Sequence, residues 1–130
     1  MPSNVTDELL DAIEQVESSG RKFVIGDKKN KHQAYGGYQM TEPAYKDVQR
    51  LYPKQFGLTK FKDMYADPKI QREAARHYLK AGEDNYGIKD HDSLIAFYNK
   101  GPSVKKTGIQ NQHYVDKVKK HLKPTIRRFK

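Results

Sequence analysis

The sequence contains no cysteine and no long apolar run. The missing cysteines exclude a disulfide framework and a metal site built from thiolates. No segment approaches the ~20 consecutive apolar residues that span a bilayer, so we expect no transmembrane segment. The early apolar residues do not read as a signal peptide, because Asp7, Glu8 and Asp11 interrupt them. We therefore expect synthesis in the cytoplasm and, for a target outside it, release by another route.

Common metal, phosphate and nucleophile motifs are missing as well. The five histidines include no His-x-x-x-His pair and no cluster with ligand spacing, so we expect no metal site. Asp84, Asp90 and Asp92 do not fit the pattern of a calcium-binding loop. The sequence has neither a Gly-x-Ser-x-Gly turn nor a phosphate-binding loop. Carboxylates and the groups around them remain as candidates for chemistry.

The positive charge is concentrated in the second half of the chain. The formal net charge is +9, with 10 basic and 9 acidic residues in positions 1–65 but 15 and 7 in positions 66–130. A basic block near the end contains Lys117, Lys119, Lys120, Lys123, Arg127 and Arg128. Such a field attracts polyanions, which include nucleic acid, anionic cell-wall polymers and acidic lipid surfaces. Charge alone does not choose among these partners.

Hydrophobic periodicity predicts a mainly helical α+β domain. The first helix is expected to begin near Thr6, which can cap it, and to end at Gly20. Further helices are expected at 42–51, from Asp67-Pro68 onward, at 93–99 and at 111–122. Gly82 lies inside the longest of these, where we expect close packing.

A small β-hairpin is expected beside a cleft. Phe23-Val24-Ile25 reads as a short strand, and residues 35–40 are expected to return as a second strand. The pair Gly36-Gly37 permits backbone angles that other residues rarely adopt. We expect a single domain over residues 1–130, with a core at about 6–123 and a basic tail at 124–130.

Glu17 is the candidate catalytic residue. It borders the apolar face of the first helix and lies at the C-terminal end of that helix. Desolvation there and the negative end of the helix dipole both disfavour a carboxylate, and desolvation must supply most of the effect. A carboxylic acid that stays protonated near neutral pH can protonate the leaving oxygen of a glycosidic bond. A Gly-Gln turn and a Tyr-Asn pair follow downstream, as a sugar-binding cleft requires.

The order of these motifs resembles the lysozyme superfamily, and it is closest to goose-type lysozymes and the catalytic domain of soluble lytic transglycosylases, including phage-encoded members. The resemblance covers about residues 7–122. Glu17-Ser18 matches the family's Glu-Ser motif, and Gly37-Tyr38-Gln39-Met40 matches its Gly-Leu-Met-Gln turn. Residues 96–102, Ala-Phe-Tyr-Asn-Lys-Gly-Pro, match its Ala-Tyr-Asn-Ala-Gly-Pro segment, and Tyr114-Val115 matches its terminal Tyr-Val.

The resemblance implies a lysozyme-like fold, no metal, no cofactor and peptidoglycan as substrate, cleaved between N-acetylmuramic acid and N-acetylglucosamine. Glu17 is then the general acid and afterwards the base. Gln39, Tyr98, Asn99 and Tyr114 are expected to shape the cleft and hold acid and sugar, and Tyr35 and Tyr38 to stack on glycan. We expect a monomer that acts on the bacterial wall, as in a phage lysis or virion-entry enzyme, with its basic half attracted to anionic surfaces.

Three positions depart from the family pattern. Tyr38 replaces a smaller apolar residue, and Lys100 replaces the usual small residue after the Tyr-Asn pair. The acidic residue often found before the terminal Tyr-Val is absent, because Gln110-Asn111-Gln112-His113 stands there. These departures bear on substrate preference more than on the class of reaction.

The sequence leaves hydrolysis and transglycosylation open. A hydrolase of this kind uses a second carboxylate, about 5–9.5 Å from the acid. Asp27 is the acid between Glu17 and the Gly-Gln turn, at a spacing similar to that of invertebrate-type lysozymes. Against this role, Asp is also common in turns for its own backbone hydrogen bonds. Lytic transglycosylases use one glutamate, and Glu8, Glu14 and Glu42 are expected to be solvated surface charges.

Two alternatives to catalysis have to be considered. The basic charge and the tyrosines are compatible with a nucleic-acid-binding module, although no nucleic-acid partner is expected. A wall-binding homologue that has lost catalysis is a second alternative, against which the retention of Glu17, Gln39, Tyr98 and Asn99 argues. Wall cleavage that Glu17→Gln abolishes would favour the enzyme, and DNA binding with a steep salt slope would favour the module.

Overall fold

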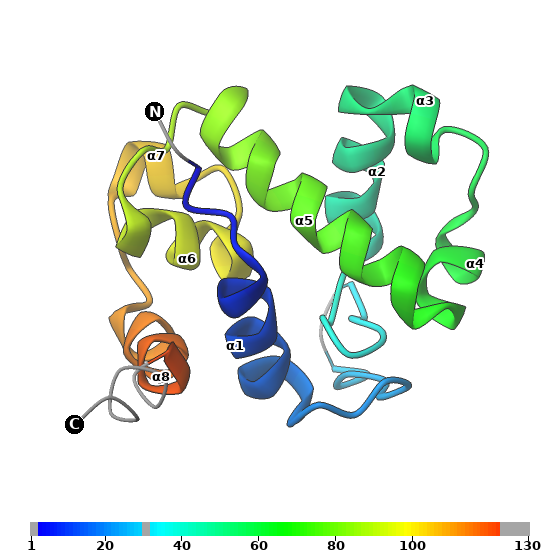
Figure 1. Ribbon diagram of the computed structural model, residues 1–130, viewed down its shortest axis with the longest axis horizontal. Coiled ribbons are helices and arrows are strands. Elements are labelled where there is room, and N and C mark those ends of the chain that lie inside the picture. The colour runs from blue at the N-terminus through cyan, green and yellow to red at the C-terminus, as the bar shows by residue number, and fades with distance from the viewer. Residues whose placement is uncertain (1–2, 30–31, 123–130) are drawn as a thin grey trace.

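The computed structural model describes residues 3–29 and 32–122, and these residues are mainly helical (Figure 1). The helices are α1 (Asp7–Ser18), α2 (Glu42–Leu51), α3 (Pro53–Phe56), α4 (Phe61–Ala66), α5 (Pro68–Asp84), α6 (His91–Lys100), α7 (Val104–Thr107) and α8 (Gln112–Leu122). The expected helices are all present. The short helices α3, α4 and α7 were not predicted, because four to six residues carry too little periodicity to read.

Helix α1 begins and ends as the sequence predicts. The Thr6 hydroxyl accepts a hydrogen bond from the Leu9 amide, and Ser19 and Gly20 adopt left-handed angles, with φ of 56° and 82°, that stop the helix. Leu9, Leu10 and Ile13 are fully buried on its apolar face. This face anchors the helix, so the position of its last turn, which carries Glu17, is fixed by the core.

Helix α5 crosses the centre of the molecule between two groups of helices (Figure 1). Helices α1, α6 and α8 lie on one side of α5, and α2, α3 and α4 lie on the other. The expected close packing at Gly82 is confirmed, because a Cβ atom there would approach the Phe97 ring to 2.9 Å and Leu94 to 3.1 Å. α6 therefore lies directly against α5.

The expected β-hairpin is reduced to two isolated bridges, and the described residues form no sheet. Ile25 pairs with Tyr35, and Tyr35 in turn pairs with Met40. Residues 35–40 do not continue as a strand, because Gly36 and Gln39 have positive φ angles of 83° and 49° and reverse the chain within six residues. The expected second strand is instead a tight turn, closed by reciprocal Tyr35–Met40 backbone hydrogen bonds of 3.0 and 3.1 Å.

The expectation that Glu14 is a solvated charge is wrong. Glu14 is only 7% exposed, and its carboxylate is paired with the Lys22 ammonium. A Cβ atom on Gly37 would lie 2.7 Å from the Glu14 carboxylate, so the Gly36-Gly37 turn rests on this side chain. Periodicity placed Glu14 on the polar side of α1, but the returning turn covers that side.

Among the described residues, no helix is both long and apolar enough to cross a membrane.

Candidate active site

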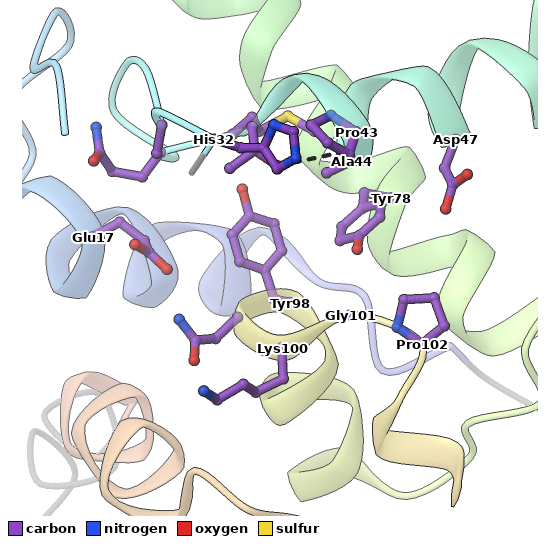
Figure 2. Close-up of a pocket in the computed structure, with 15 residues that line it drawn as sticks. Glu17, His32, Pro43, Ala44, Asp47, Tyr78, Tyr98, Lys100, Gly101 and Pro102 are labelled. Atoms are coloured by element: carbon purple, nitrogen blue, oxygen red, sulfur yellow. Dashed lines mark hydrogen bonds between the residues drawn. The ribbon is translucent and has the colours of Figure 1, made fainter. Parts of the chain in front are cut away.

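A cleft of about 450 Å³ opens between the last turn of α1, residues 32–44 and the C-terminal end of α6 (Figure 2). Glu17, Gln39, Tyr98 and Asn99, four of the residues selected from the sequence, line it. Lys100, the last residue of α6, continues this wall together with Gly101 and Pro102, which follow the helix. The motifs that lie far apart in the sequence therefore converge on one surface.

Glu17 is held at the end of α1 by a contact from α8. The Tyr114 hydroxyl donates a hydrogen bond of 2.7 Å to a Glu17 carboxylate oxygen. Burial raises the pKa of Glu17 from 4.5 to about 7, although the Tyr114 hydrogen bond acts in the opposite direction. Desolvation thus outweighs the hydrogen bond, which is the cause that the sequence predicted. The raised pKa allows Glu17 to hold a proton closer to neutral pH than an exposed glutamate does.

Tyr98 stands beside Glu17 as a buried phenol. Its hydroxyl donates a hydrogen bond of 2.8 Å to the Tyr38 carbonyl oxygen, which ties α6 to the Gly36-Gly37 turn. Burial raises the pKa values of Tyr98 and Tyr114 well above the ordinary value for tyrosine, and the charge of Glu17 adds to the effect. Both phenols therefore stay protonated near Glu17 and act as hydrogen-bond donors.

Gln39 locks the turn that forms one wall of the cleft. Its amide nitrogen donates hydrogen bonds to the carbonyl oxygens of Val24 (3.1 Å) and Gly36 (2.9 Å). Both amide hydrogens are thus used by the backbone, and the amide oxygen remains as the acceptor that Gln39 can offer to a ligand. This geometry connects the segment after α1 to the wall that faces Glu17.

Gln71, on α5, is a supporting residue that the sequence analysis missed. It is 2% exposed, donates a 2.7 Å hydrogen bond to the Tyr35 carbonyl and accepts a 3.0 Å hydrogen bond from the Tyr38 amide. Its spacing to Ala74, Ala75 and Tyr78 places a polar side chain on the apolar face of a helix. That spacing was the available signal, because a polar residue on a buried face needs hydrogen-bond partners.

The structure does not place Tyr38 where the sequence predicted. Tyr38 is 3% exposed and does not line the cleft, so its ring is not available for stacking on glycan. Its hydroxyl accepts a 2.8 Å hydrogen bond from Arg72, which also binds Asp11 on α1. The larger side chain at this position therefore joins the turn to a charged network between α1 and α5.

Tyr35 lies outside the main cleft. Its ring stacks on Tyr65, with ring centroids 4.3 Å apart, and it lines a second hollow of about 290 Å³ together with Phe61 and Glu42. The hollow shares His32 with the cleft, so the two are neighbours on the surface. One face of the Tyr35 ring is taken by this packing.

The structure does not bring Asp27 into the cleft. Asp27 is exposed, and its carboxylate accepts a 2.9 Å hydrogen bond from the Lys29 amide, as in an ordinary turn. Asp47, which the sequence analysis did not select, lines the cleft but lies at the opposite end from Glu17 (Figure 2). It accepts a 3.1 Å hydrogen bond from Tyr86. Among the described residues, no second carboxylate therefore lines the end of the cleft where Glu17 lies.

No group of three or more His, Cys, Asp or Glu side chains within residues 3–29 and 32–122 could hold a metal ion.

Comparison with known proteins agrees with this geometry. The family model of the transglycosylase SLT domain matches residues 2–120. The crystal structure of an inhibitor-bound lysozyme from Meretrix lusoria is similar to this chain, with a TM-score of 0.71 and 19% identity over 92% of each chain. A chain in the crystal structure of Aeromonas hydrophila PliI in complex with Meretrix lusoria lysozyme has a TM-score of 0.70 and 18% identity, covering 92% of this chain and 93% of its own.

The search of curated proteins gives no significant match. At such low identity the structural likeness shows a lysozyme-like fold, whereas the family model covers nearly the whole chain and includes every residue that lines the cleft. The chain therefore belongs to the transglycosylase SLT domain family and is a peptidoglycan-cleaving enzyme of the lytic transglycosylase or lysozyme type.

Proposed function

We propose that this protein is a lytic transglycosylase that cleaves the bond between N-acetylmuramic acid and N-acetylglucosamine with Glu17 as its single acid and base. The observation that carries the proposal is the buried Glu17 carboxyl with its raised pKa, at an end of the cleft that no other described carboxylate lines. A two-carboxylate hydrolase needs its second carboxylate within about 5–9.5 Å of the acid. Asp27 is outside the cleft and Asp47 is at the far end, which favours the single-glutamate mechanism.

The proposed reaction uses Glu17 twice. The protonated carboxyl donates its proton to the glycosidic oxygen, and the bond between that oxygen and C1 of the muramyl residue breaks. The C6 hydroxyl oxygen of the same residue then bonds to C1, assisted by the substrate's acetamido group, and its proton passes to the Glu17 carboxylate. The product is a 1,6-anhydro sugar. The acid is regenerated and no water is consumed.

The neighbouring side chains support both steps in this proposal. The hydrogen bond from Tyr114 limits the rise of the Glu17 pKa, so that the carboxyl can give up its proton as well as hold it. Tyr98 and the end of α6 hold the opposite wall at a fixed distance from the turn through the Tyr98–Tyr38 hydrogen bond. Asn99 then offers its amide group, and Gln39 its amide oxygen, to the glycan.

We also infer that the basic half of the chain draws the enzyme to anionic wall polymers. Lys117, Lys119 and Lys120 lie on α8, while Lys123, Arg127 and Arg128 lie outside the described residues. Electrostatic attraction of this kind is screened by salt. Binding to purified walls should therefore weaken as the salt concentration rises from 50 to 500 mM, and salt-independent binding would contradict the inference.

Mass spectrometry of digested, purified peptidoglycan tests the proposed reaction. The proposal expects products that end in 1,6-anhydromuramic acid, which are lighter by one water than reducing-end products. Glu17→Gln is the control and is expected to release neither product. Reducing-end products would establish hydrolysis instead. Wall cleavage that persists in Glu17→Gln would remove Glu17 from the mechanism.

A further inference from the structure

Asn111, the residue before α8, has a buried amide oxygen without a hydrogen-bond partner within residues 3–29 and 32–122. Buried polar atoms are nearly always paired, so an unpaired one needs an explanation. The residue lies within the Gln110–His113 segment, where this chain departs from its family's pattern. The other half of its amide group contacts the end of α6, which carries Asn99 into the cleft.

The contacts of Asn111 fix which way its amide points. Its nitrogen donates hydrogen bonds to the Ala96 carbonyl oxygen (3.3 Å) and to the Asn99 side-chain oxygen (3.0 Å). The nitrogen and oxygen of an amide are told apart by their partners, and a backbone carbonyl can only accept. The NH2 group of Asn111 must therefore face α6, which turns the oxygen away from any donor.

The orientation of Asn111 in turn decides that of Asn99. A side-chain NH2 group that faces Asn99 selects the Asn99 oxygen as its partner, because two NH2 groups cannot form a hydrogen bond with each other. The Asn99 NH2 group is then left on the side of the cleft wall. The same orientation leaves the Asn111 oxygen without a hydrogen-bond partner among the described residues.

We propose that Asn111 is a positioning residue that turns the Asn99 amide so that Asn99 presents a hydrogen-bond donor to the glycan. This inference rests on the proposed function of the cleft. The group that Asn99 would contact is an acceptor oxygen of the sugar, either an acetamido carbonyl or a hydroxyl. Asn111 itself does not line the cleft and acts through Asn99.

A double-mutant cycle tests whether the two residues act as one unit. The rate of wall cleavage at limiting substrate is measured for Asn99→Ala, Asn111→Ala and the double variant. Each single variant should lose one neutral hydrogen bond to the substrate, so its rate of wall cleavage should fall about fivefold to tenfold. The double variant is expected to be no slower than Asn99→Ala. Gln110→Ala, which removes an exposed neighbouring side chain bonded to the Thr107 carbonyl, is the matched control and should retain full activity.

A second variant and a pH profile separate positioning from a general disturbance of α8. Asn111→Asp keeps the size of the side chain but removes both donors, so the Asn99 NH2 group would turn to the new carboxylate and leave the cleft. The rate of wall cleavage should fall at least as much as in Asn111→Ala. The pH profile is measured on Asn111→Ala, which adds no charge near the cleft. If this change displaced α8, the Tyr114–Glu17 hydrogen bond would weaken and the alkaline limb of the profile would move upward. The inference expects that limb to stay in place.

Three outcomes overturn the inference: full activity of Asn111→Ala, a cleavage rate in the double variant that falls by the product of the two single losses, or an upward shift of the alkaline limb in Asn111→Ala. The proposed function fails separately, through reducing-end products or through cleavage by Glu17→Gln, and neither result depends on Asn111. An inactive Glu17→Gln together with a fully active Asn111→Ala would leave the reaction intact and reject the positioning role alone.

Discussion

Replacing Glu17 by glutamine should make the protein more stable at alkaline pH while it abolishes wall cleavage. Burial raises the pKa of Glu17 from 4.5 to about 7 in the folded state. The carboxyl therefore holds its proton more tightly when the protein is folded. Its stabilising contribution is fully present below pH 4.5 and is lost as the pH rises to about 7. Above that pH, the folded protein carries a buried carboxylate.

The size of the effect follows from the two pKa values. Each pKa unit corresponds to about 1.4 kcal/mol, so a rise from 4.5 to about 7 amounts to about 3 kcal/mol of unfolding free energy. Glutamine has nearly the same shape, cannot ionise, and can still accept the hydrogen bond from Tyr114. The free energy of unfolding of Glu17→Gln, relative to the native sequence, should therefore increase by about 3 kcal/mol between pH 4 and pH 8.5.

Urea unfolding of both proteins at these two pH values measures this difference. The comparison cancels the titration of groups that the two proteins share. Glu8→Gln is the matched control, since it removes an exposed carboxyl from the same helix. The difference in unfolding free energy between Glu8→Gln and the native sequence should change far less between the two pH values. A difference between Glu17→Gln and the native sequence that is the same at both pH values would refute the raised pKa. Glu17 would then be ionised near neutral pH and could not act as the proton donor.

Three further changes probe the parts around Glu17. Tyr114→Phe removes a hydrogen bond that lowers the Glu17 pKa. The alkaline limb of the pH–activity profile should therefore move above its position near pH 7. A downward shift would contradict the Tyr114–Glu17 hydrogen bond. Asp27→Asn should leave the rate of wall cleavage, followed as the loss of turbidity of a wall suspension, within about twofold, because Asp27 lies outside the cleft. A much larger loss of this rate would restore Asp27 as a catalytic partner. Gly36→Ala should reduce the unfolding free energy by about 2–4 kcal/mol in urea, since a Cβ atom would be strained at φ 83° and would overlap the Gln71 amide. Gly108→Ala, at φ 71° with no atom within 4 Å, carries only the strain, and an equal loss in both variants would show that Gln71 plays no part.

The local elements were predictable because their signals lie within a few residues of one another. Thr6 caps α1 and Gly20 follows its end, and the apolar spacing of α1 and α5 gives their buried faces. Glu17 was selected for its place beside that apolar face, and its burial followed. The expected hairpin was not confirmed, because positive φ angles at Gly36 and Gln39 close residues 35–40 into a turn.

Long-range packing decided what the periodicity could not. Glu14 was assigned to water by its place on α1, yet the turn from residues 35–40 covers it and Lys22 neutralises it. Tyr38 was expected to face sugar, but Arg72 from α5 holds its hydroxyl away from the cleft. Asn111 carries no recognisable motif, and its contact with Asn99 exists only because α6 and α8 pack together.

The sequence by itself determined the helices, the candidate acid and the order of the motifs around it, because these depend on residue type and near spacing. Only the tertiary structure decided how strongly Glu17 is desolvated, that Glu14 is buried as well, and that Asp27 and Tyr38 do not line the cleft. The Tyr114–Glu17 hydrogen bond joins residues 97 positions apart. A proton affinity that depends on burial and on such a contact is a property of the packed chain.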